Sequence, residues 1–193
     1  MESEIPKGYA TNSAPIGLVA GSVGRSDRML RAATFVFALA VLVHNGDHLR
    51  RGGDSVSAQV FWVGSAAIVV EVAVVVAVFL RHPMAPIAAV AVGFGLAAGY
   101  LLVHFTPQRG WLSDSLTGGD ASAFTVFAAV LETAASILLG ATGVWWLRRG
   151  GLAATTTSGG ASISLARAVA HPVVAAMIIG NAVIFVGSLV TRA

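Results

Sequence analysis

The chain has 193 residues, of which 56% are hydrophobic and only 11% are charged. Soluble domains carry about 25% charged residues, so this composition excludes an ordinary soluble domain and predicts an integral membrane protein. Cysteine is absent, which excludes disulfides and thiolate metal sites. The net charge of +3 comes from arginines scattered between apolar runs, so we expect no nucleic-acid partner.

The chain begins with a polar segment, residues 1–26, which contains glycine and serine and has acidic residues where a signal peptide would be basic. This composition predicts a disordered cytoplasmic tail.

Five apolar runs follow, each near the ~20 residues that a helix needs to cross a bilayer core of ~30 Å. Because a backbone in lipid must pair internally, we expect an all-α helical bundle. A linker rich in glycine, serine and threonine, residues 150–165, separates a four-helix core, residues 27–149, from a fifth-helix segment, residues 166–193. The expected helices are residues 29–48, 57–80, 85–106, 121–147 and 172–190.

The basic residues predict the orientation of the bundle. Eight of them fall on the side of the N-terminus and four on the opposite side, so the positive-inside rule places the N-terminus in the cytoplasm and the C-terminus outside. We therefore expect a multi-pass protein of the cell membrane, with the lipid bilayer as its partner. The eight are Lys7, Arg25, Arg28, Arg31, Arg81, Arg148, Arg149 and Arg167, and the four are Arg50, Arg51, Arg109 and Arg192.

The first helix ends in a polar motif, HNGDHLRR, at residues 44–51. The apolar stretch before it, residues 32–43, covers only ~18 Å as a helix, so we expect the motif to lie within the outer zone of the membrane. Helical spacing puts His44, Asp47 and His48 on one face. Two imidazoles one turn apart can bind one metal ion, with Asp47 as a further ligand or as an orienting partner.

Two more residues are expected at the depth of this motif. His104 lies at the end of the third helix, and Asp114 lies in the loop that follows. Histidines with a carboxylate suit zinc, iron or copper, and haem b between His44 and His104 is an alternative. The same groups also suit hydrogen bonds between helices or to lipid phosphates. The candidate metal ligands are His44, Asp47, His48, His104 and Asp114.

Two acids, Glu71 and Glu132, lie near the middle of apolar helices. A carboxylate at that depth is costly unless it is neutral or paired, so we expect both to face the bundle interior. There they can share a proton, as in a relay or a substrate gate, or join two helices by hydrogen bonds. In the third helix, Gly95 and Gly99 form a G-x-x-x-G pattern that favours packing within the chain.

The motif at residues 44–52, with His104 and residues 111–115, resembles that of small multi-pass membrane proteins of actinobacterial type. The resemblance covers the first four helices and implies a topology but no activity.

Three classes of function follow from these residues. The first is a metal- or haem-dependent membrane protein that acts at the outer membrane face. The second is a transporter or proton-conducting module that uses Glu71 and Glu132. The third is an accessory or assembly subunit of a larger membrane complex, with other membrane subunits as partners. None of the three identifies a reaction, so whether the protein is an enzyme stays open.

Overall fold

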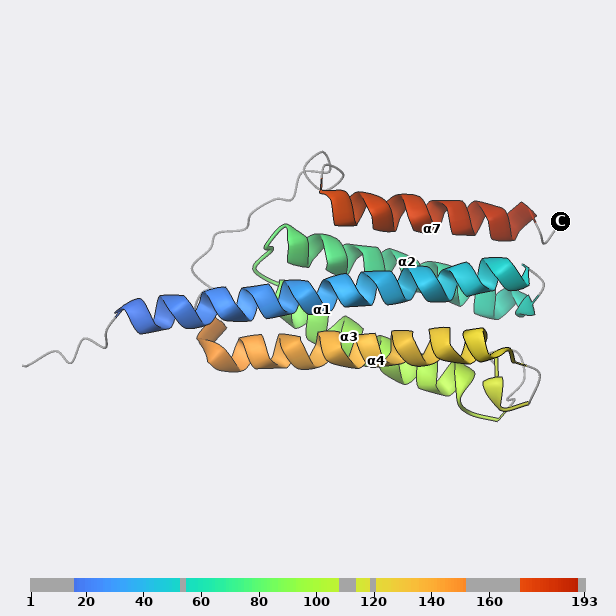
Figure 1. Cartoon of the computed structure of the whole chain (residues 1–193), viewed down its shortest axis with the longest axis horizontal. Helices are drawn as coiled ribbons and strands as arrows, with labels where there is room; N and C mark the ends of the chain where they lie inside the picture. The colour runs from blue at the N-terminus through green and yellow to red at the C-terminus, as the bar shows by residue number, and fades with distance from the viewer. Residues whose placement is uncertain (1–15, 53–54, 108–113, 119–120, 152–170, 191–193) are drawn as a thin grey trace, which may run out of the picture.

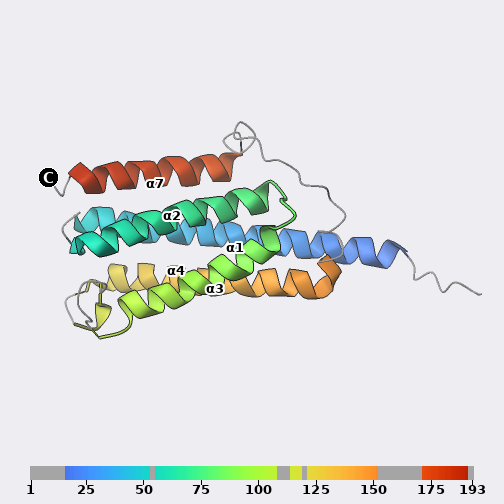
Figure 2. The same ribbon diagram turned by 180° about the vertical axis from the view of Figure 1, so that it is seen from behind.

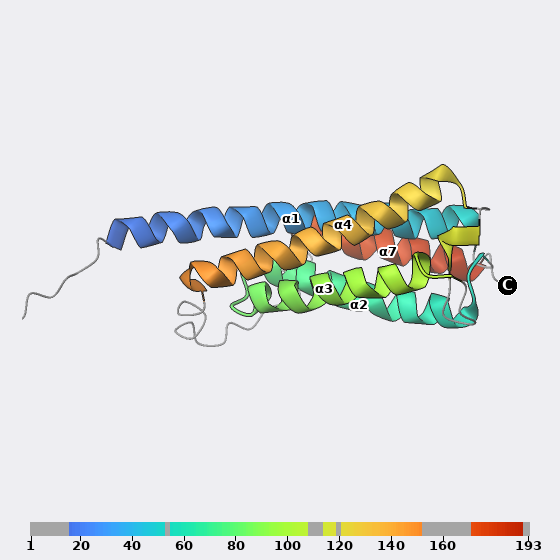
Figure 3. The ribbon, with the colours of Figure 1, turned by 90° about the horizontal axis from the view of Figure 1, so that it is seen from below.

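The computed structural model describes residues 16–52, 55–107, 114–118, 121–151 and 171–190. Five helices in these residues are long and apolar enough to cross a membrane, which confirms the predicted all-α membrane bundle. They run side by side along one axis, and α1 extends past the others at its N-terminal end (Figures 1 and 3). The long helices are α1 (Ile16–Arg51), α2 (Ala58–Phe79), α3 (Ala85–His104), α4 (Ala123–Trp146) and α7 (Pro172–Val190).

Two short elements complete the fold. A 3-10 turn, η3 (Leu116–Gly118), lies between α3 and α4, and a π-helical turn, η4 (Leu147–Gly151), continues α4. The bundle end at which α1 ends and α4 begins is referred to below as the histidine end. Whether this end faces outward stays a prediction; labelling a cysteine placed at Thr117, in η3, from either side of the membrane tests it.

Helix α1 is longer than its apolar run predicts. It begins at Ile16 rather than at residue 29, so residues 16–26 are helical rather than a disordered tail. Hydropathy reports the apolar part of a helix, and a helix can continue beyond the bilayer. At its other end α1 continues to Arg51, where Asp47 accepts hydrogen bonds from two arginines one turn later. Residues 1–15 and 152–170, which hold the rest of the predicted tail and most of the linker, lie outside the described residues.

The other helix boundaries follow from local capping. Ser57 and Ser122 were expected inside helices but are the N-caps of α2 and α4, and their hydroxyls accept hydrogen bonds from the backbone N–H of Val60 and Thr125. Helix α3 ends at His104 with Phe105 as its C-cap, and Pro107 excludes Thr106, the last residue of the expected helix, from helical geometry.

Helix α1 contacts α2, α4 and α7, while α3 contacts α2 and α4. Figure 2 shows α2 and α3 together on one side of α1. The core contains Phe37 and Val41 of α1, Leu139 of α4 and Met177 of α7, each fully buried. The outer faces are apolar as well, as a lipid-facing surface requires.

Helices α3 and α4 approach each other at glycines. A Cβ atom placed on Gly93 would lie 2.5 Å from the backbone nitrogen of Gly140, and one placed on Gly143 would lie 2.8 Å from the carbonyl oxygen of Pro86. These small residues let the two backbones meet, as in other membrane helix pairs. The G-x-x-x-G pattern does not take part, since a Cβ on Gly95 or Gly99 would have no neighbour within 4 Å.

Candidate functional site

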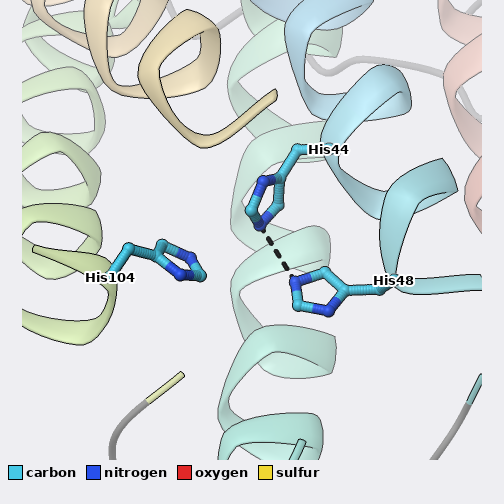
Figure 4. A group of neighbouring side chains, drawn as sticks. All are labelled: His44, His48 and His104. Carbon is cyan, nitrogen blue, oxygen red and sulfur yellow. Dashed lines mark hydrogen bonds between the residues drawn. The ribbon is translucent and has the colours of Figure 1, made fainter. Parts of the chain in front are cut away.

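Three histidines meet at the histidine end (Figure 4). His44 and His48 lie one turn apart on α1, and His104 is the last residue of α3. His44 and His104 are buried, and His48 is partly buried. One ring nitrogen from each histidine lies within 4.8 Å of the others, a grouping that can hold a metal ion. The predicted meeting of these three residues is therefore present in the structure.

The contacts of the rings indicate which nitrogens carry protons. The Nδ1 of His104 lies 3.1 Å from the carbonyl oxygen of Asp114 and donates to it, so its Nε2 is free to accept or to ligate. The guanidinium of Arg51 has no acceptor and lies 2.9 Å from Nδ1 of His48, so Nδ1 accepts and Nε2 carries the proton. That Nε2 lies 3.0 Å from Nε2 of His44, which must then accept.

The two predicted carboxylate ligands are bound to arginines, and Oδ2 of Asp114 also lies 3.5 Å from Nδ1 of His104. Asp47, 1% exposed, accepts from Arg50 at 2.7 Å and from Arg51 at 3.0 Å. The side chain of Asp114 accepts from Arg51 at 2.9 Å, and its backbone oxygen orients His104. Asp114 therefore orients the ring of His104, one of the roles that the sequence suggested, whereas Asp47 holds Arg51, which contacts His48.

The charge of Arg51 also acts on Asp114, which lies between α3 and α4. Burial acts to raise the pKa of the Asp114 carboxyl, but the hydrogen bonds and charge of Arg51 outweigh burial and leave the pKa below its ordinary value. Asp114 is therefore ionised at neutral pH, and its pairing with Arg51 ties the loop to the end of α1.

Glu71 and Glu132 meet through a residue that the sequence analysis did not single out. The hydroxyl of Tyr100, on α3, lies 2.6 Å from Oε1 of Glu71 and 2.8 Å from Oε1 of Glu132. Both acids are at most 2% exposed. A tyrosine hydroxyl has one proton to donate, so both contacts are hydrogen bonds only when one of the carboxyls carries a proton. Tyr100 lies four residues before His104, and that helical spacing was the available signal for it.

The acidic group and the histidines form one continuous cluster. Nδ1 of His44 lies 3.5 Å from Oε2 of Glu132, and neither atom has a hydrogen-bond partner among the described residues. The rings of His44 and Tyr100 are 5.9 Å apart between centroids. Candidate residues predicted in two separate places therefore belong to one site, built from α1, α2, α3 and α4.

A second missed residue ties the last helix to this end of α1. Asn181 of α7 is buried, and its Oδ1 accepts a hydrogen bond of 2.8 Å from Asn45, next to His44. A single amide side chain within an apolar helix was the feature of the sequence that could have predicted a hydrogen bond between helices here. The contact places α7 against the site, although α7 contributes none of the clustered titratable groups.

A cavity of about 210 Å³ lies beside the cluster, between α1, α2, α3 and α7. Its polar lining includes His44, His48, Glu71, Tyr100 and His104. No protein-family model matches this sequence, and no curated protein or solved structure is significantly similar to it. The candidate function therefore depends on the chemistry of these residues alone.

Proposed function

We propose that this multi-pass membrane protein binds one transition-metal ion through His44, His48 and His104. The observation that carries the proposal is the convergence of three imidazoles, two of them buried, with ligand atoms within 4.8 Å of one another. The contact of Nδ1 of His104 with Asp114 leaves its Nε2 available to ligate an ion.

The spacing of the ring nitrogens fits a tetrahedral ion. Bonds of about 2.0–2.1 Å from zinc to imidazole place two ligand nitrogens about 3.3 Å apart. The two Nε2 atoms of His44 and His48 are 3.0 Å apart, and all three ligand nitrogens lie within 4.8 Å of one another, so binding would draw the rings closer together. Two of the three ligand rings also have a group that orients them. Asp114 accepts a hydrogen bond from His104, and Glu132 faces His44.

The donor set and the local charge favour a divalent ion with an open coordination position. Imidazole suits zinc, copper and iron, and three protein ligands are typical of metal sites that also bind water or substrate. Among the described residues no lysine or arginine pairs with Glu71 or Glu132. With one carboxyl protonated, as the two Tyr100 contacts require, the other leaves a negative charge that an ion beside it would help to balance. The cavity next to the histidines gives the open position its space.

Haem fits this arrangement poorly. Two axial imidazoles lie on opposite faces of the macrocycle, with their ring centroids about 6 Å apart and the porphyrin between them. The centroids of His44 and His104 are 5.0 Å apart, and His48 lies 4.7 Å from His44 in the same space. We therefore propose a bare metal ion rather than haem b.

Metal content tests the proposal. Protein purified without chelators, or reconstituted with Zn²⁺ or Co²⁺, should hold about one ion per chain. His44→Ala and His104→Ala should each lose the ion, whereas His82→Ala, which removes a histidine in the turn between α2 and α3, should keep it. For Nε2 of His48 to ligate, the neutral ring must take the tautomer with its proton on Nδ1, and this ends the contact of Nδ1 with Arg51. Metal-free protein after reconstitution, with an intact fold, would contradict the site.

A second candidate is proton transfer, favoured by the Tyr100 bridge. A path of contacts runs from His48 to His44 at 3.0 Å, to Glu132 at 3.5 Å, to Tyr100 at 2.8 Å and to Glu71 at 2.6 Å. Each group on this path can give or take a proton. Proton flux into vesicles that contain the purified protein, lost in Tyr100→Phe, would support this function over the metal site. No flux above that of empty vesicles would exclude it.

A further inference from the structure

The cavity beside the site is mostly apolar, and its space comes from glycines. Gly64 of α2 and Gly95 and Gly99 of α3 line it, and a Cβ atom on any of the three would have no neighbour within 4 Å. At Gly93 and Gly140, by contrast, a Cβ would press on the facing helix. The glycines of the G-x-x-x-G pattern therefore leave open space rather than bringing two helices together.

The walls of the cavity suit a flat apolar ring. Phe61 of α2 and Phe185 of α7 both line it, and their rings are stacked with centroids 5.8 Å apart. A cavity of about 150 Å³ in an apolar protein core is large enough to bind benzene. The volume here, about 210 Å³, suits one substituted six-membered ring and is too small for a porphyrin.

Glu71, which lines the cavity, has one carboxyl oxygen without a partner among the described residues. Oε2 of Glu71 is buried and makes no hydrogen bond among the described residues, although Oε1 of the same carboxyl accepts from Tyr100. Burial of such an atom costs about 1–3 kcal/mol unless a donor reaches it. Rotation of the Glu71 carboxyl toward the cavity would let a ligand hydroxyl supply that donor.

The cavity reaches the lipid-facing surface. Val63, which lines it, is 56% exposed, and its neighbour Trp62 is 58% exposed. In a membrane this side of α2 faces lipid, so a neutral molecule dissolved in the bilayer can enter there. A charged ligand would have to cross the apolar surface, which is unfavourable.

We propose that the cavity binds a lipid-soluble, hydroxyl-bearing aromatic ring of the quinol class, with one hydroxyl donated to Oε2 of Glu71. The ring packs against Phe61 and Phe185 and occupies the space that Gly64, Gly95 and Gly99 leave open. The proposal concerns binding and does not depend on a metal ion at the histidines.

Calorimetric titration of the detergent-purified full chain with tetramethylhydroquinone, kept reduced, tests this pocket. Gly99→Leu fills the cavity and should weaken binding by at least about tenfold. The matched control is Gly24→Leu. Gly24 also has open space around its Cβ position, but it lies on α1 and does not line the cavity. The control should bind within about twofold of the parent.

The role of Glu71 is tested with a second ligand and a second variant. Tetramethylbenzene, which has the same carbon skeleton without hydroxyls, should bind about tenfold more weakly, and Glu71→Leu should remove that difference. Equal binding of the two compounds to the parent, or equal binding of the quinol to Gly99→Leu and Gly24→Leu, would overturn the proposal. Titrations repeated after chelator treatment should agree, which separates failure of this pocket from failure of the metal site.

Discussion

Gly93→Ala should destabilise the bundle by about 3 kcal/mol or more, the largest effect expected of an added methyl group at any glycine that the structure describes. The added Cβ would lie 2.5 Å from the nitrogen of Gly140 and 2.7 Å from the carbonyl oxygen of Ser136. Both are backbone atoms of α4, so neither can turn aside as a side chain does. Relief requires α3 and α4 to separate, and these helices hold His104 and Glu132.

The matched control for this substitution lies two residues away. Gly95→Ala puts the same methyl group on the same helix, where nothing lies within 4 Å, so stability should change by less than about 1 kcal/mol. Unfolding of the two variants by SDS titration from detergent micelles measures the difference. Equal stability of the two would mean that α3 and α4 do not meet at Gly93.

Asp47→Ala should cost about 3 kcal/mol of unfolding free energy, because it breaks a buried ion pair by removing one partner. Asp47 is 1% exposed and accepts hydrogen bonds from Arg50 and Arg51. The side chain of Arg50 is half exposed and can return to water. That of Arg51 is 19% exposed and, among the described residues, keeps only Asp114 as a carboxylate partner. Most of the lost unfolding free energy therefore comes from leaving Arg51 without Asp47.

Asp27→Ala is the control on the same helix. Asp27 is 31% exposed and lies 3.7 Å from the well-exposed Arg81, so its removal should cost less than about 1 kcal/mol. The same SDS titration compares the two variants. Asp47→Ala should also weaken metal binding, since Arg51 contacts His48. A loss of stability no greater than that of Asp27→Ala would show that the arginines do not depend on Asp47.

The membrane fold was predictable because the bilayer restricts the choices. A run of about 20 apolar residues leaves the backbone only a helix, so five runs predicted the five helices that the structure contains. The length of α1 was not predictable in this way. Residues 16–28 include three charged side chains, and hydropathy carries no information about a helix outside the lipid.

The site was predictable where its residues share one helix. The spacing of His44, Asp47 and His48 predicted that they share one face of the helix, and the matching depth of His104 predicted that it lies near them. Contacts between helices were harder to predict, because no sequence spacing reports them. Tyr100 between two glutamates is one such contact, and the pairing of Arg51 with Asp114 is another.

The contacts of α1 with later helices have a consequence for biosynthesis. The end of α1 enters the membrane first, yet its partners come later in the chain. His44 contacts His104 on α3 and Glu132 on α4. Arg51 pairs with Asp114 in the loop after α3, and Arg50 bonds to Ser122, the N-cap of α4. Until about two thirds of the chain has been made, the end of α1 has only local partners. It must therefore wait at the lipid headgroups or inside the insertion machinery, and a chain truncated after α2 should be held there or degraded.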